Sequence, residues 1–237
     1  MRKYCDLHLR PKDLTEENLT EVARLLNEFG FKVVGLTFPV SANAGKIERA
    51  KEIFKGFNVD LAPRADLRPK NREELLRLVR RLRRRFEVVG VECPSSQVAA
   101  VAARDRRVDI IYFPLTNLRV RFKHTTAHVS TSALEINLAE LIPLKSRNSV
   151  IERVRSEVLI AKKNGIPIVI STGATSSLLI RAPREMAACG LLFNLKFPEA
   201  LDSVSTIPVA IIERNRDKLS PSYVAEGIRV VKDAGGR

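Results

Sequence analysis

The first strand-like segment of the chain carries three polar residues at alternate positions, Asp6, His8 and Arg10. Alternate residues of a β-strand point to the same face, so we expect these three side chains to lie together. A histidine at position 10 would complete an Asp/His/His set of metal ligands. The permanent cation of Arg10 instead repels a divalent metal and attracts phosphate. The pattern therefore favours binding of a polyanion over metal-dependent hydrolysis.

Further polar residues lie toward the ends of other strand-like segments, namely Arg64 with Asp66, Glu92, Glu135 with Asn137, and residues 171–175. A divalent metal site needs at least three converging Asp, His or Glu ligands. Only Asp6, His8 and Glu92 are predicted to remain from such a site, so we expect neither a bound metal nor a catalytic residue. His8 is then predicted to hydrogen-bond to Asp6 or Glu92.

Seven short runs rich in Val, Ile and Leu predict buried parallel strands, over residues 3–9, 31–38, 59–67, 88–93, 109–113, 133–138 and 166–171. Helical spacing of apolar residues lies between them, over residues 16–29, 72–86 and 148–164, where Gly165 is a stop signal. Repeated strand–helix units predict one α/β domain over residues 1–237, a TIM-like (β/α) barrel. An open doubly wound sheet is the alternative.

The C-terminal part of the chain is less clearly patterned. Residues 191–195 and residues 209–212 both qualify as the eighth strand. Ser220 and Pro221 predict the start of a last helix, about residues 220–233, with Val224, Ile228 and Val231 on one face. Residues 235–237 are expected to form a frayed tail.

The charge of the chain is strongly unbalanced, with 41 Lys and Arg against 27 Asp and Glu, a net charge of +14. A thermophilic origin explains many charges of both signs but not an excess of one sign. The excess favours a nucleic acid as partner. Aromatic residues make up only 5% of the chain, which argues against base stacking and for recognition of the backbone of folded RNA.

Segment 119–124 is the strongest candidate for RNA contact, because it alternates basic and apolar residues and contains no acidic residue. The seven arginines of helix 72–86 are interpreted mainly as a solvated face, with Glu73, Glu74 and Glu87 as local partners. The residues predicted to bind RNA are Arg10, Arg119, Arg121, Lys123, His124, Lys145, Arg147, Arg181 and Arg184.

The chain lacks the long apolar run of a membrane span and the apolar core of a signal peptide, so a cytoplasmic location is expected. Cys5, Cys93 and Cys189 have no zinc-binding spacing, and the first two are predicted to be buried thiols. Neither a phosphate-binding loop nor a dinucleotide-binding motif occurs.

Three short motifs, Asp6-Leu7-His8, Gly90-Val91-Glu92 and Glu135-Ile136-Asn137, follow one another in the order found in another group of barrels. This order resembles the polymerase and histidinol phosphatase (PHP) superfamily of metal-dependent phosphoesterases. The chain departs from it at Arg10, Gly173 and Thr175, where that superfamily has metal ligands. A phosphoesterase of the PHP type with a degenerate ligand set is therefore an alternative function.

The altered pattern resembles the archaeal ribonuclease P protein component 3 family more closely. The resemblance covers nearly the whole chain and is carried by residues 4–8, 133–137, 168–174 and 181–185. It implies a PHP-related barrel that is a subunit of a ribonucleoprotein endonuclease removing 5′ leaders from precursor tRNA. The implied partners are the catalytic RNA, a small protein subunit and other holoenzyme proteins, with precursor tRNA contacted indirectly. By this resemblance, the RNA catalyses the reaction with Mg²⁺, and the isolated chain binds no cofactor and is not catalytic. A third hypothesis is a scaffold protein of the same fold whose charge reflects only adaptation to high temperature.

Overall fold

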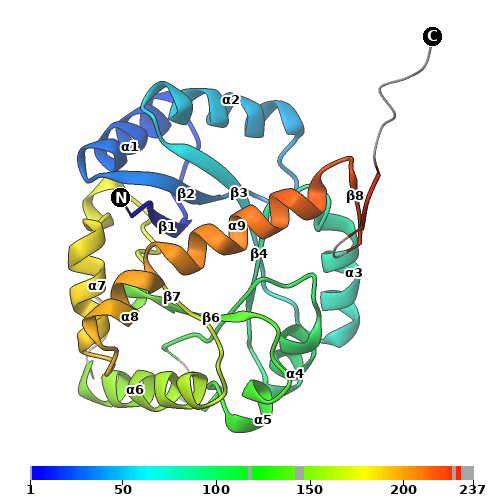
Figure 1. Cartoon of the computed structure of the whole chain (residues 1–237), viewed down its shortest axis with the longest axis vertical. Helices are drawn as coiled ribbons and strands as arrows, with labels where there is room; N and C mark the ends of the chain where they lie inside the picture. The colour runs from blue at the N-terminus through cyan, green and yellow to red at the C-terminus, as the bar shows by residue number, and fades with distance from the viewer. Residues whose placement is uncertain (1, 117–118, 142–146, 226–227, 231–237) are drawn as a thin grey trace.

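The structure, a computed structural model, describes residues 2–116, 119–141, 147–225 and 228–230. Parallel strands that neighbour one another in chain order form a seven-stranded sheet within these residues (Figure 1). The strands are β1 (Tyr4–Leu9), β2 (Phe31–Thr37), β3 (Asp60–Leu67), β4 (Val88–Glu92), β5 (Ile110–Tyr112), β6 (Ala133–Asn137) and β7 (Ile168–Ser171). All seven predicted strands are confirmed, with ends that differ by one or two residues.

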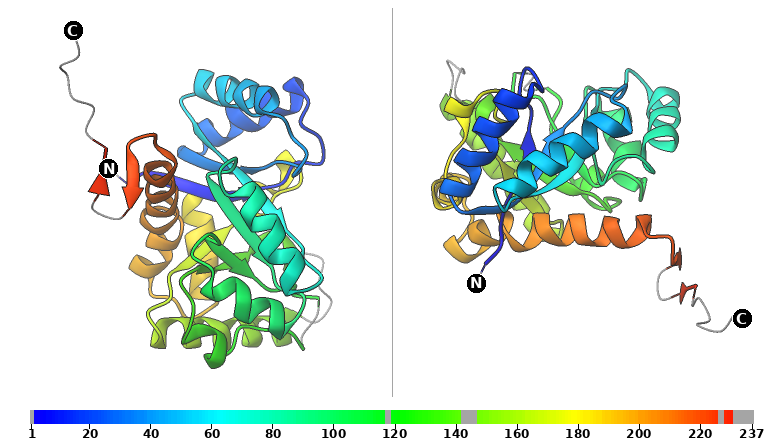
Figure 2. Two further views of the ribbon diagram at one scale, coloured as in Figure 1. Left: turned by 90° about the vertical axis from the view of Figure 1, so that its right-hand side faces the viewer. Right: turned by 90° about the horizontal axis from the view of Figure 1, so that it is seen from above.

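Helices surround the sheet, as Figures 1 and 2 show. They are α1 (Glu16–Glu28), α2 (Ala44–Gly56), α3 (Arg72–Leu82), α4 (Ser96–Arg104), α5 (His124–Ala127), α6 (Arg147–Lys163), α7 (Pro183–Leu191), α8 (Phe197–Ser203) and α9 (Thr206–Leu219), with short 3-10 helices at Leu138–Glu140 and Ser177–Leu179. Side chains of Thr15, Asn43, Asn71 and Ser95 cap the first four helices. The three predicted helices are confirmed as α1, α3 and α6, and Gly165 adopts the positive φ expected after a helix.

The barrel closes without an eighth strand in the described part of the chain. At the C-terminal end of the strands, the backbone N–H of Arg10 donates to Ala174 O at 2.8 Å. At the other end, the N–H of Cys5 donates to Val204 O, just after α8. Both predicted eighth strands are wrong, because residues 191–195 hold the last residue of α7 and the turn after it, and residues 209–212 lie inside α9. Short apolar runs have no period that separates a strand from a buried helix.

Helix α9 crosses the N-terminal end of the barrel, as Figure 1 and the right view of Figure 2 show. Its Ile211 and Ile212 pack against apolar side chains inside the barrel, among them Cys5, Val33 and Val88. The helix therefore closes one end of the barrel with apolar contacts.

The predicted helix at about residues 220–233 is wrong where the structure describes it. Helix α9 ends at Leu219 with Ser220 as its C-cap, and β8 (Tyr223–Ala225) and β9 (Ile228–Arg229) form an antiparallel hairpin. Pro221 cannot continue the backbone hydrogen bonding of α9, and the β-branched residues that follow favour a strand. Val231 and the predicted frayed tail lie outside the described residues. None of the described helices is both long and apolar enough to cross a membrane.

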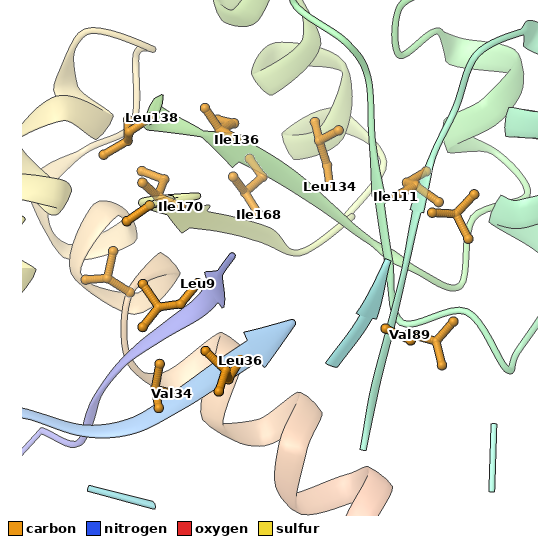
Figure 3. Packing of buried hydrophobic residues seen from close by; sticks show 14 of the residues in the cluster. Leu9, Val34, Leu36, Val89, Ile111, Leu134, Ile136, Leu138, Ile168 and Ile170 are labelled. Atoms are coloured by element: carbon orange, nitrogen blue, oxygen red, sulfur yellow. The ribbon is translucent and has the colours of Figure 1, made fainter. Parts of the chain in front are cut away.

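The hydrophobic core has an outer and an inner part. Strand side chains such as Leu36, Ile111 and Ile168, labelled in Figure 3, belong to one cluster with the buried faces of the helices. Cys5 and Cys93 are buried, as predicted, and Cys189 is half-buried. Inside the barrel an apolar layer lies next to α9, and polar side chains follow toward the C-terminal ends of the strands.

Candidate functional site: a central ion cluster and its basic surroundings

Arg64, on β3, is completely buried inside the barrel. Its Nη1 and Nη2 donate to the two carboxylate oxygens of Glu135, on β6, at 2.7 Å each. Its Nε donates to Asp66 Oδ1 at 2.9 Å, and Nη1 also donates to Leu7 O at 3.0 Å. The planar guanidinium is thus held by two carboxylates and a backbone carbonyl, the geometry to which its rigid fork of donors is suited.

His8 bridges the same two carboxylates. Its Nε2 lies 2.9 Å from Asp66 Oδ2, and its Nδ1 lies 3.2 Å from Glu135 Oε2. Burial and the Arg64 charge lower the pKa of His8, but Asp66 and Glu135 outweigh them and raise it to about 9. His8 is therefore an imidazolium at neutral pH. The predicted partners, Asp6 and Glu92, are wrong. We call Arg64, His8, Asp66 and Glu135 the central ion cluster.

The two carboxylates of the central ion cluster stay ionised although they are buried. Burial raises the pKa of Glu135, but the charges of Arg64 and His8 overcome this and lower it to about 2. The same two cations also lower the pKa of Asp66 against the effect of burial. Thr37 Oγ1 donates a further hydrogen bond of 2.8 Å to Asp66. Two cations thus face two anions, and the charge of the cluster is balanced.

Asp6 belongs to a separate contact on the β7 side of the barrel. It accepts hydrogen bonds from the hydroxyl of Thr172 and from the Thr172 backbone N–H, the latter at 3.1 Å. Burial raises the pKa of Asp6 to about 6 in spite of these bonds. The register of β1 shifts between Asp6 and Leu9, and Arg10, half-buried after the strand, has no part in the cluster. Asp6 and His8 are both buried, and the His8 backbone N–H donates to Asp6 Oδ1 at 3.2 Å, whereas Arg10 is only half-buried.

A divalent metal does not fit among these side chains. The guanidinium of Arg64 lies between the carboxylates that would bind the ion, and its charge and that of His8 would repel the ion. Among the described residues, no group of three or more His, Cys, Asp or Glu side chains is arranged to hold a metal.

Two glycines shape the space around the central ion cluster. A Cβ at Gly90 would lie 2.8 Å from Arg64 Nη2 and 2.6 Å from Asp66 Oδ1, so only glycine leaves room for the ion pair. Gly173 has a φ of +61°, and a Cβ there would lie 1.9 Å from Asn137 Oδ1. The Asn137 amide thus occupies the space that a side chain at position 173 would need.

Glu92 lies at the rim of the barrel rather than in the central ion cluster. Its carboxylate pairs with Arg68, on the loop after β3, at 2.7 Å. Glu140 is nearby: burial raises the pKa of Glu140, the charge of Glu92 adds to this, and the charge of Arg10 opposes it. Of the predicted remnant of a metal site, Asp6 and His8 are buried neighbours, whereas Glu92 lies apart at the rim, which carries charges of both signs.

The predicted RNA-binding loop, residues 119–124, has an exposed basic side and a buried anchor. Arg121 and Lys123 are exposed, whereas Phe122 is buried and its N–H donates to Glu157 Oε1 at 3.1 Å. Glu157 also accepts a hydrogen bond from Arg153. The sequence contains no acid in this loop, but α6 places one directly beneath it.

Most of the remaining predicted RNA-binding residues that the structure describes are exposed. Arg119, Arg181 and Arg184 are exposed, as is His124 at the start of α5. Arg181 Nη1 donates to the carbonyl oxygens of two neighbouring residues, each at 2.8 Å. Lys145 and the side chain of Arg147 lie outside the described residues. Several of the predicted residues are therefore exposed cations, and their role in RNA binding stays a prediction.

Comparison with known proteins identifies the family. A sequence profile of the RNase P subunit p30 family matches residues 3–220. The chain belongs to the RNase P subunit p30 family. It is 25% identical over 241 residues to ribonuclease P protein component 3 of Methanosarcina barkeri, covering 98% of this chain and 97% of the relative. It is 30% identical over 188 residues to the protein of that name from Methanosarcina mazei, covering 76% of this chain and 74% of the relative.

The fold of this family member also matches a solved structure. A chain in the cryo-EM structure of archaeal ribonuclease P with mature tRNA superposes with a TM-score of 0.83 at 18% identity, covering 97% of this chain and 99% of that one. The match shows a shared TIM-like fold. The predicted family and the predicted barrel are thus confirmed.

The sequence pattern places Arg64, Asp66, Glu135 and Thr172 near strand ends but does not predict the contacts that they make. A usable signal was present in β3, where Arg64 and Asp66 alternate within an apolar strand. Charged side chains that point into a barrel must be paired, because burial of an isolated charge is very costly. Two opposite charges on one face of a buried strand therefore indicate an internal ion pair.

Proposed function

We propose that the chain is a protein subunit of ribonuclease P that binds and organises the catalytic RNA during removal of 5′ leaders from precursor tRNA. The observation that carries this proposal is the family match over residues 3–220. The relatives from two Methanosarcina species are named as protein component 3 of ribonuclease P, and one of them aligns over nearly its whole length. The excess of positive charge supports a polyanionic partner.

The isolated chain is not catalytic in this proposal. The central ion cluster supports this part, because a guanidinium takes the place that a catalytic metal would need. Its buried cations and anions neutralise each other and leave no free base or nucleophile there. The RNA then catalyses the cleavage with Mg²⁺ as its cofactor, and the protein chain itself binds no cofactor.

The chain acts by lowering the electrostatic cost of bringing RNA phosphates together. Exposed cations near the C-terminal ends of the strands, including Arg121 and Lys123, contact the catalytic RNA, and precursor tRNA is engaged indirectly. A small protein subunit and other holoenzyme proteins complete the assembly. Each cationic contact replaces counterions around the RNA, so the requirement for free Mg²⁺ falls.

Reconstitution tests the role in the holoenzyme. Precursor tRNA cleavage is measured over a range of Mg²⁺ concentrations with the catalytic RNA and the small protein subunit, with and without this chain. We expect cleavage at a lower Mg²⁺ concentration when the chain is present. An unchanged Mg²⁺ requirement would show that the proposed role is wrong.

A separate assay tests the isolated chain. The chain is incubated with a generic phosphodiester and Mn²⁺ or Zn²⁺, and no hydrolysis is expected. Hydrolysis that a chelator removes, and that Asp66→Asn or Glu135→Gln abolishes, would instead support the PHP-type phosphoesterase.

A further inference from the structure

Helix α3 presents a stripe of arginines to solvent. Its Leu75, Val79 and Leu82 are buried against the barrel. The exposed side, continued into the turn after the helix, carries Arg77, Arg80, Arg81 and Arg84. Their spacing of three, four and seven residues places them along one face of a helix.

Two other arginines of this segment have structural partners. Arg83 donates to the carbonyl oxygens of Phe86 and Glu87, at 2.9 and 2.8 Å, and pairs with the buried Asp109. Arg85 donates to Val40 O at 3.2 Å and to a second carbonyl of the same loop. Such contacts hold the α3–β4 connection in place, so these two side chains serve the fold.

The four stripe arginines have no such role. Within the described residues, none of them forms an ion pair or a side-chain hydrogen bond. Four unpaired like charges on one face repel one another, and folding does not require them. A bound anion would relieve the repulsion.

Helix α4 extends the positive surface. It packs beside α3, and the two helices run in the same direction because both connect parallel strands (Figure 1). Arg104 ends α4 and Arg106 follows it, and both are exposed. The acid between them, Asp105, is held by Arg107 at 2.6 and 2.9 Å and so does not neutralise them. The helix dipole favours a cation at a helix C-terminus. This effect accounts for one arginine on each of the two helices but not for the six exposed arginines on and after them.

The chemistry of this surface fits a phosphate backbone. None of the exposed large apolar side chains in the described residues belongs to α3 or α4, so the surface lacks the apolar centre of a protein interface or of a membrane-inserting face. Arginine binds phosphate oxygens with two parallel hydrogen bonds. Closely spaced guanidinium groups without aromatic neighbours suit the backbone of an RNA helix rather than its bases.

We propose that Arg77, Arg80, Arg81, Arg84, Arg104 and Arg106, the helix arginine surface, bind the phosphate backbone of the catalytic RNA. This inference rests on the proposed function. Arg80, Arg81, Arg84, Arg104 and Arg106 lie at or after the C-terminal ends of their helices, next to the N-terminal ends of the strands. The loop of residues 119–124 follows β5 and lies at the opposite end of the barrel. The two surfaces therefore contact separate segments of the RNA.

The test compares two triple variants with equal loss of charge. Arg80→Gln, Arg81→Gln and Arg84→Gln alter the helix arginine surface and leave Arg83 and Arg85 intact. The control variant is Arg24→Gln, Arg49→Gln and Lys162→Gln, in which each lost cation already has a carboxylate partner. Binding to the catalytic RNA of ribonuclease P is measured at several salt concentrations, and unfolding by denaturant checks that both variants are folded.

We expect the slope of log affinity against log salt to become shallower by about 2–3 in the helix variant and by less than about 1 in the control. Backbone footprinting of the RNA should lose one protected segment in the helix variant and retain another. Equal slope changes in both variants, or an unchanged footprint, would overturn the inference. So would an unchanged slope accompanied by loss of the small protein subunit, because the surface would then bind protein.

The wild-type chain separates this inference from the proposed function. If the wild-type chain binds the RNA and lowers the Mg²⁺ requirement while the helix variant behaves like the control, only the RNA-binding role of the helix arginine surface is wrong. If the wild-type chain neither binds the RNA nor affects cleavage, the proposed function itself is wrong.

Discussion

Arginines in two regions of this molecule have opposite roles. Inside the barrel, Arg64 is fully buried and every part of its guanidinium is engaged by Glu135, Asp66 or Leu7 O. On the outside of α3, Arg80 and Arg84 are exposed and without partners in the described residues. The comparison teaches that an arginine supports the fold when water is excluded and carboxylates surround it, and is available for binding when neither condition holds.

The same contrast occurs between neighbours in the sequence. Arg83 reaches inward to the buried Asp109, whereas Arg84 points to solvent. Residue type and local composition are identical at these two positions. Only the direction of the side chain on the turn after α3 decides which of them contributes to stability.

The largest expected effect is the loss of the buried guanidinium. Arg64→Met leaves Asp66 and Glu135 as buried anions without their main partner, so we expect the free energy of unfolding to fall by about 3–5 kcal/mol. Arg84→Met, the matched exposed change, should alter it by less than about 0.5 kcal/mol. Equilibrium unfolding in denaturant measures both. Similar losses of unfolding free energy in the two variants would show that the buried and exposed arginines do not differ in their contribution to stability.

The pH dependence of stability should come next in size. The pKa of His8 rises from 6.5 to about 9 on folding, so protonated His8 stabilises the folded chain fully below pH 6.5. This contribution is lost as the pH rises through 9, and we expect the free energy of unfolding to fall by on the order of 3 kcal/mol over that interval. Denaturant unfolding at several pH values measures it. His8→Gln should show a much smaller fall, and an identical fall would assign the effect to other groups.

Two glycine substitutions compare a crowded buried position with an exposed one. Gly173→Ala places a methyl group against Asn137 at a positive φ, so we expect a loss of roughly 1–3 kcal/mol. Gly56→Ala, at the exposed end of α2 with no atom near its Cβ position, should instead stabilise by up to roughly 1 kcal/mol. Thermal unfolding of both variants tests this. A stable Gly173→Ala variant would mean that Asn137 moves freely.

The smallest expected effect concerns the basic loop. Arg121→Gln with Lys123→Gln should make the salt dependence of RNA binding shallower by about 1–2. Two lost cations release fewer counterions than the three lost from the helix arginine surface, so the total change should be smaller. Salt titrations of binding measure it beside the α3 variant. A larger change per lost charge in the loop would show that the loop contributes more to RNA binding than the α3 arginines, as the sequence alone favours.

Most of the fold could be predicted from the sequence because its signals are local. The seven strands are short apolar runs, and α1, α3 and α6 repeat apolar residues with helical spacing. The end of the chain could not be predicted equally well. Val224 and Ile228 are four residues apart and fit one face of a helix, yet they lie in a hairpin because α9 has already ended at Leu219.

The sequence by itself determined the barrel, the family motifs and the excess of positive charge. Only the tertiary structure decided which charges are free. Glu135 lies 71 residues from Arg64, and His8 lies still farther from Glu135, so no local pattern reveals that these charges neutralise one another. Their pairing follows from the closed barrel, which brings β1, β3 and β6 around one small buried volume, where an unpaired charge would be too costly.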